Sequence, residues 1–199
     1  MKTRLGIGVI GGGGRGWLSA YSHQPRKGIR IVAVCDIVPA TLAAYRDKYG
    51  QDIFCTSDYR ELLKRDEVGA VFICSPDFLH EEHAVAALKA GKPIYLEKPM
   101  AITLAGCDRI LRTAAKLKGK LYLGHNMRHM TFVQKMRKLI QDGAIGEVKA
   151  AWCRHFISYG GDAYFKDWHA DRTKSTGLLL QKAAHDIDVL HWLCGGYTQ

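Results

Sequence analysis

Apolar residues in the first 124 positions come in short runs separated by helical patterns. Six runs predict strands, at Leu5 to Ile10, Arg30 to Cys35, Asp52 to Cys55, Ala70 to Cys74, Pro93 to Leu96 and Leu121 to Gly124. These runs do not alternate apolar with polar positions, so both faces of each strand are expected to be buried. The pattern therefore predicts an α/β fold, a doubly wound parallel sheet with helices on both faces.

Residues that begin or end helices lie between these runs. Pro39 suits the first turn of a helix, and Asp58 suits an N-cap. Further helices are expected from His80 to Ala90 and from Thr103 to about Gly119, because a glycine marks the end of each.

The pattern changes after residue 124. A helix is expected from Thr131 to Asp142, a long strand from Glu147 to Ser158, and a second helix from about Lys182 to Leu193. We therefore predict two domains: residues 1–124 fold around the parallel sheet, and residues 125–199 are the start of an α+β domain. This second domain is expected to be incomplete, because a single strand does not form a sheet.

A glycine-rich turn follows the first predicted strand. Gly11, Gly13 and Gly16 satisfy the G-x-G-x-x-G pattern between a strand and a helix. In such a turn the first glycine permits the tight bend, the second lets the backbone approach a pyrophosphate, and the third lets the helix pack closely on the strand. The sequence thus predicts a Rossmann domain that binds a dinucleotide.

An acidic residue at the end of the second strand supports the same interpretation. Asp36 lies 20 residues after Gly16, where a carboxylate accepts hydrogen bonds from the adenosine ribose. This carboxylate would repel a ribose 2′-phosphate, and the next residues, Ile37 and Val38, supply no arginine. We therefore expect NAD rather than NADP, although Arg15 and Arg46 remain candidates for a phosphate contact.

The fifth predicted strand runs into Glu97, Lys98 and Pro99. The carboxyl ends of parallel strands are where open α/β sheets bind ligands, so Lys98 is expected to face the crevice. For this segment taken alone, a surface charge pair before a proline is the alternative, less favoured interpretation.

Several motifs together resemble one family. They are the glycine turn, Ser75-Pro76-Asp77 with His80, the stretch from Gly91-Lys92-Pro93 to Glu97-Lys98-Pro99, and Ala184-His185-Asp186. Over essentially the whole chain they resemble the glucose-fructose oxidoreductase and inositol dehydrogenase (Gfo/Idh/MocA) family. The resemblance implies an NAD(P)-dependent dehydrogenase that transfers a hydride between a nicotinamide cofactor and a secondary hydroxyl of a sugar, cyclitol or sugar derivative.

The resemblance also assigns roles to residues. Lys98 is the implied active-site lysine, Glu97 lies near the nicotinamide ribose, and His185 is the acid/base beside the substrate. A neutral imidazole suits this role because it can accept the hydroxyl proton as hydride leaves. The implied cofactor contacts also include Ser75, Pro76, Asp77 and His80, and the candidate substrate contacts are Asn126, Arg128, Trp168 and Asp186.

Two positions depart from the family pattern. Many members carry an acid four residues before the histidine, where this chain has Gln181 followed by Lys182. Because glutamine cannot relay a proton, Lys182 becomes a candidate catalytic residue. Asp77 stands where asparagine is usual, which leaves the local ribose contacts open.

Composition adds little to this picture. The formal charge is +10, but the basic residues are spread through predicted helices without interleaved aromatics, so we expect no nucleic-acid partner. Six scattered cysteines contain no C-x-x-C pair, which predicts reduced thiols and no metal site. No apolar stretch reaches the roughly 20 residues of a membrane span, and we expect a cytoplasmic enzyme that forms homo-oligomers.

Two other functions remain open. Some relatives are NAD-dependent glycosidases that oxidise a sugar transiently. Alternatively, the chain is a truncated, non-catalytic dinucleotide-binding module.

Overall fold

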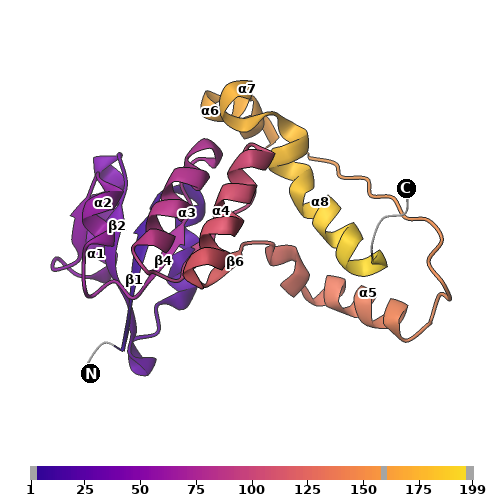
Figure 1. Ribbon diagram of the computed structural model, residues 1–199, viewed down its shortest axis with the longest axis horizontal. Coiled ribbons are helices and arrows are strands. Elements are labelled where there is room, and N and C mark those ends of the chain that lie inside the picture. Colours follow the sequence, from indigo (N-terminus) through magenta and orange to yellow (C-terminus); the bar gives the residue numbers. More distant parts are fainter. Residues whose placement is uncertain (1–3, 158–160, 196–199) are drawn as a thin grey trace. The chain divides into compact units, whose positions relative to one another are not determined.

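The computed structural model describes residues 4–157 and 161–195 (Figure 1). It divides into two compact units, Met1–Gly124 and His125–Gln199.

A six-stranded parallel sheet forms the centre of the first unit. The strands are β1 (Leu5–Ile10), β2 (Ile29–Cys35), β3 (Phe54–Thr56), β4 (Ala70–Ile73), β5 (Ile94–Leu96) and β6 (Leu121–Leu123). Their order is β3-β2-β1-β4-β5-β6, so the direction of winding reverses between β1 and β4. All six predicted strands are confirmed, and the order is that of a Rossmann fold.

Helices cover both faces of this sheet (Figure 1). One face packs against α2 (Tyr59–Leu63), α3 (His80–Lys89) and α4 (Leu104–Leu117), and its core includes Leu62, Leu88 and Ile110. The other face packs against α1 (Pro39–Tyr49), whose buried Tyr45 stacks on Trp17 with ring centroids 4.8 Å apart. Burial on both faces explains why the strands carry unbroken apolar runs.

The predicted helix boundaries depend on local hydrogen bonds. Pro39 occupies the first turn of α1. The Asp58 side chain accepts a hydrogen bond from the backbone N–H of Arg60 at 2.9 Å, and Thr103 accepts one from Gly106 at 3.0 Å. These caps satisfy backbone donors that the first turn of a helix leaves unpaired.

Three short 3₁₀ helices complete the first unit: η1 (Gly14–Ser22), η2 (Pro25–Lys27) and η3 (Asp77–Leu79). The helix after the glycine turn is therefore a 3₁₀ helix, in which the Gly16 N–H donates to the Gly13 carbonyl at 2.7 Å.

The described residues of the second unit contain only helices and irregular segments. The helices are η4 (Asn126–His129), α5 (Thr131–Gln141), η5 (Gly161–Phe165), α6 (Asp167–Ala170), α7 (Arg172–Ser175) and α8 (Leu178–Cys194). Helix α8 begins about one turn before the predicted start at Lys182. It packs against α5, where the Arg137 guanidinium lies 4.2 Å from the centre of the Trp192 ring.

The strand predicted from Glu147 to Ser158 is wrong over the residues that the structure describes. Residues 148–157 form neither helix nor strand, and most of their side chains are exposed; Ser158 lies outside the described residues. A strand needs a neighbour for its backbone hydrogen bonds. The described part of this unit offers no second extended segment in that role.

Candidate active site

The glycine turn connects β1 to η1 at the switch point of the sheet. Gly11 has φ +82°, and a side-chain carbon there would lie 2.5 Å from the Ser75 nitrogen. At Gly16 such a carbon would lie 2.1 Å from the Gly11 carbonyl oxygen. The fold itself therefore requires glycine at both positions.

Gly13 is different, because the fold does not exclude a side chain there. A Cβ on Gly13 would have its nearest neighbours at 3.7 and 3.8 Å, which is ordinary van der Waals contact, and the backbone φ is −74°. The open backbone at Gly13 is what close approach of a pyrophosphate requires. The residues of the turn thus fit a dinucleotide phosphate.

Asp36 at the end of β2 is held by two backbone groups. Its Oδ2 accepts a hydrogen bond from the Gly13 N–H at 3.0 Å, and its Oδ1 accepts one from the Val38 N–H at 2.8 Å. The following side chains, Ile37 and Val38, are exposed and apolar. The acidic strand end and the glycine turn are therefore joined directly.

A second connection joins the glycine turn to the end of β5. Arg15 donates to Oε1 of Glu97 from Nε at 3.2 Å and from Nη2 at 3.1 Å. The Glu97 carboxylate is buried, and its Oε2 accepts a hydrogen bond from the backbone N–H of Lys98 at 2.7 Å. Arg15 is thus engaged with Glu97, and the Lys98–Pro99 peptide bond that follows is cis.

Two buried histidines of α3 lie behind the ends of β4 and β5. His80 lies between the carbonyl oxygens of Pro99 and Ser75, and His83 Nδ1 lies 2.9 Å from the Ser75 hydroxyl. Burial lowers the pKa of His83 to about 4, with smaller contributions from the nearby charges. His83 was not among the sequence candidates, although its spacing of three residues from His80 places both on one helix face.

The Cys74 thiol follows β4 and is partly buried, and desolvation raises its pKa to about 12. None of the six cysteines forms a disulfide.

In the second unit, α8 carries Lys182, His185 and Asp186. His185 is buried, and its ring meets that of His125 edge to face, with centroids 6.2 Å apart. Asp186 pairs with His155, whose Nδ1 lies 2.9 Å from a carboxylate oxygen. Helix α8 thus carries the predicted polar residues, and two of them contact histidines outside the helix, His125 and His155, that sequence reasoning missed.

Arg128 and Trp168 contact α8 directly or through one intermediate residue. Arg128 donates to the two oxygens of Asp188 at 2.8 and 2.5 Å. Trp168 stacks on His169 with ring centroids 3.7 Å apart, and His169 lies 2.9 Å from the Gln181 amide nitrogen. The remaining candidate, Asn126, is the first residue of η4, the helix that contains Arg128.

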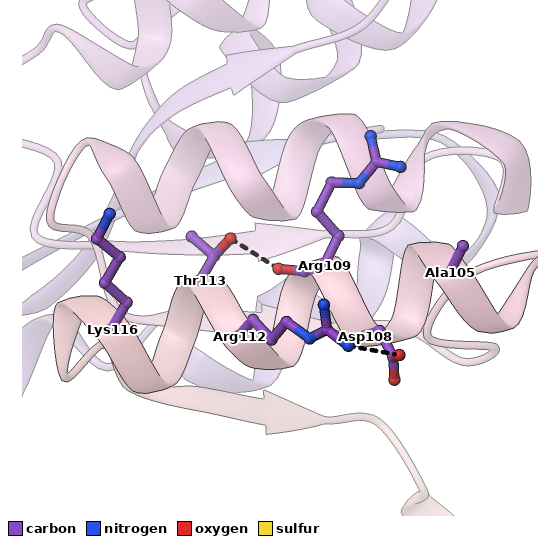
Figure 2. Close-up of a pocket in the computed structure, with 6 residues that line it drawn as sticks. All are labelled: Ala105, Asp108, Arg109, Arg112, Thr113 and Lys116. Carbon is purple, nitrogen blue, oxygen red and sulfur yellow. Dashed lines mark hydrogen bonds and ion pairs between the residues drawn. The ribbon is translucent and has the colours of Figure 1, made fainter.

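A shallow pocket on α4 lies apart from these residues (Figure 2). It is lined by Ala105, Asp108, Arg109, Arg112, Thr113 and Lys116, all from this one helix. Arg112 pairs with Asp108 at 3.3 Å, and Arg109 pairs with Glu81 at 3.0 Å. None of the residues at the carboxyl ends of the strands lines this pocket. We therefore take the strand-end residues, and not this pocket, as the candidate active site.

Within the described residues, no group of three or more histidine, cysteine or acidic side chains is arranged to hold a metal ion. No helix in the described part of the chain is both long and apolar enough for a bilayer crossing.

The fold and the strand-end residues define a Rossmann-type dinucleotide-binding oxidoreductase. Comparison with known families agrees: residues 5–125 match the model described as "Oxidoreductase family, NAD-binding Rossmann fold", and residues 133–199 match the "GFO/IDH/MocA C-terminal domain". The chain therefore belongs to the GFO/IDH/MocA oxidoreductase family, as the sequence motifs predict.

Similar proteins include dehydrogenases and one hydratase. The chain is 31% identical over 194 residues to an inositol 2-dehydrogenase of Salmonella paratyphi B, covering 97% of this chain and 55% of that protein. It is 31% identical over 201 residues to a 2,7-anhydro-N-acetylneuraminate hydratase of Mediterraneibacter gnavus, covering 100% of this chain and 51% of the relative. The chain thus spans about half the length of these curated relatives.

A solved structure of an oxidoreductase domain protein from Kribbella flavida superposes with a TM-score of 0.79 at 31% identity. The match covers 97% of this chain and 53% of that one.

Proposed function

We propose that this chain belongs to an NAD-dependent dehydrogenase that oxidises a secondary hydroxyl of a sugar, cyclitol or sugar derivative. The observation that carries the proposal is the turn at Gly13, which leaves open the approach that a pyrophosphate needs and is joined to Asp36. The substrate class rests on the names of the relatives, which include an inositol dehydrogenase and a sialic acid derivative hydratase.

NAD is the proposed cofactor, and NADP the less suitable one. Asp36 would accept hydrogen bonds from the ribose hydroxyls and would repel a 2′-phosphate. Arg15 is directed toward Glu97, to which its Nε and Nη2 donate, so its charge is already paired with a carboxylate.

A nicotinamide dinucleotide held by the glycine turn and Asp36 would supply the acceptor for the hydride of the carbinol C–H bond. The hydroxyl proton goes to His185, and the carbinol becomes a ketone. Lys98 donates a hydrogen bond to the reacting oxygen and stabilises negative charge that develops there. Lys182, on the same helix as His185, is the proposed partner in moving the proton onward.

The first test compares two glycines of the turn. Gly13→Ala is expected to keep the thermal midpoint of the protein without ligand and to abolish the stabilisation by NAD, because the new methyl group occupies the pyrophosphate approach. Gly14→Ala is the control, since a Cβ at Gly14 meets nothing within 4 Å; its φ of +45° makes some general strain expected without loss of NAD binding. Wild-type protein that gains no thermal stability from NAD at about 100 times a typical Kd, where about 2.7 kcal/mol is expected, contradicts the proposal.

The second test addresses chemistry. Lys98→Met and His185→Asn are each expected to lower hydride transfer by roughly 10²–10⁴-fold while NAD still stabilises the protein. NADH formation over a panel of cyclitols and aldoses is the measurement. Unchanged turnover in Lys98→Met would overturn the assignment.

The hydratase relative favours one second candidate, a reaction without net redox change in which the sugar is oxidised only transiently. Cleavage or hydration of a sugar derivative without accumulation of NADH would support this candidate, including the glycosidase form. Binding of NAD without any turnover would instead support a non-catalytic dinucleotide-binding module.

A further inference from the structure

His80 is in contact with two groups that only accept hydrogen bonds. It is the first residue of α3 and is 1% exposed. Its Nδ1 lies 2.6 Å from the Pro99 carbonyl oxygen, and its Nε2 lies 2.8 Å from the Ser75 carbonyl oxygen. A neutral imidazole has only one N–H, so two such bonds require a proton on both nitrogens.

We propose that His80 is held as an imidazolium whose two N–H groups join the loops after β4 and β5, which makes it a positioning residue for Lys98. The positive charge strengthens both bonds, and 2.6 Å is a short distance for a hydrogen bond donated by a nitrogen to a carbonyl oxygen. This positioning role rests on the proposed function of Lys98, whereas the protonation of His80 does not.

Lys98 is fixed on both sides of its Cα. On one side its backbone N–H donates to Glu97, which Arg15 holds in turn. On the other side, the carbonyl of Pro99 accepts from His80. The segment that carries the proposed catalytic lysine is thereby tied both to the glycine turn and to the end of β4.

His83 provides an internal contrast on the same helix. Its partner is the Ser75 hydroxyl, which can donate as well as accept, so a neutral ring satisfies the contact. Burial keeps His83 neutral by lowering its pKa to about 4. Two buried histidines that touch the same serine therefore differ in protonation, because one faces acceptors alone.

The other charged or titratable groups on the elements around His80 are Cys74, Asp77, Glu81, Glu82, His83, Lys89, Tyr95, Glu97 and Lys98 and, on α4, Cys107, Asp108, Arg109, Arg112 and Lys116. Glu97 is engaged by Arg15, and Glu81 pairs with Arg109. The N–H groups of the proposed His80 imidazolium link the loop after β4, at Ser75, to the loop after β5, at Pro99.

The protonation of His80 is tested directly by nitrogen NMR of the full chain labelled in histidine. We expect both ring nitrogens of His80 to show the signals of protonated nitrogen at neutral pH, while His83 shows one protonated and one bare nitrogen. A His80 ring with a single N–H at neutral pH overturns the proposal. Neither measurement needs a dinucleotide, so failure of NAD binding would count against the proposed function alone.

The positioning role is tested with two variants that each keep one donor. The amide nitrogen of His80→Asn takes the place of Nδ1 and keeps the bond to Pro99, whereas that of His80→Gln takes the place of Nε2 and keeps the bond to Ser75. We expect the Lys98 amide to exchange its hydrogen at least about tenfold faster in His80→Gln and within about twofold of wild type in His80→Asn.

Exchange at the core amide of Val71 is the control, because general destabilisation would accelerate it equally. Equal exchange at Lys98 in both variants, or an increase matched at Val71, would show that His80 does not position Lys98. If a variant does not fold, the nitrogen signals of the wild-type protein still decide the protonation.

Discussion

The two units of this chain stabilise their polar residues in different ways. In the first unit, side chains at the strand ends contact backbone groups: Asp36 accepts from Gly13, Glu97 accepts from Lys98, and His80 lies between two carbonyl oxygens. In the second unit the contacts run between side chains, as in the pairs of Arg128 with Asp188 and His155 with Asp186.

The first unit also buries more hydrophobic side chains than the second. Among the described residues, the buried hydrophobic side chains of the second unit are only Val133 and Leu193, and all others belong to the first unit. Large apolar side chains such as Phe156 and Leu179 are instead 86% and 75% exposed. In the first unit, called the sheet unit below, the polar residues named above are thus held by backbone groups. In the second unit, the helical unit, the polar residues named above are held by other side chains.

The strongest test of this difference removes a leucine from each unit. Leu96→Ala in β5, where the side chain is fully buried, is expected to lower the free energy of unfolding by about 4 kcal/mol, because it leaves a cavity. Leu179→Ala in α8 should change it by less than about 0.5 kcal/mol. Urea unfolding followed by circular dichroism measures both, and equal losses would refute the contrast.

A pH series tests the buried histidine of the sheet unit. Above pH 6.5 His83 is neutral in both states, but below it the unfolded chain binds a proton that the folded ring rejects until about pH 4. The free energy of unfolding should therefore fall by roughly 3 kcal/mol as pH drops through this window.

His83→Asn keeps a donor near Ser75 and lacks the titration, so this part of the decline should disappear in urea unfolding measured at each pH. An identical pH profile in the two proteins would contradict the assignment.

Loss of the ion pair between Arg128 and Asp188 in the helical unit should lower the free energy of unfolding by a somewhat smaller amount. Asp188→Asn removes the charge that binds Arg128, and about 2 kcal/mol of stability should be lost because the Asp188 side chain is only 10% exposed. Trp192 fluorescence during urea unfolding follows this region, since Trp192 lies near Arg128. Lys138→Met is the control: its pair with Asp142 is exposed, and its loss should be nearly silent.

The smallest effect is expected at a helix cap. Thr103→Ala removes the acceptor for the Gly106 N–H and should cost about 1 kcal/mol, whereas Thr103→Ser should cost less. Thermal unfolding of the two variants distinguishes the loss of the cap from a general effect of substitution. A Thr103→Ala variant as stable as wild type would show that the cap adds nothing to the sheet unit.

The sequence alone determined the parallel sheet, because unbroken apolar runs are what strands buried on both faces require. It also determined the glycine turn and Asp36, since these depend on short spacings next to a strand. The strand expected from Glu147 could not be judged in this way, because pairing depends on a distant neighbour that local pattern does not reveal.

Only the tertiary structure decided how the site residues are held. The ion pair of Arg15 with Glu97 joins positions 82 residues apart, and no local pattern indicates it. The structure also separated the motif glycines: a Cβ at Gly11 or Gly16 would clash with backbone atoms, whereas a Cβ at Gly13 would make only ordinary van der Waals contacts. Likewise, both carbonyl partners of His80 come from loops that the parallel sheet brings to one edge, and these partners set its protons.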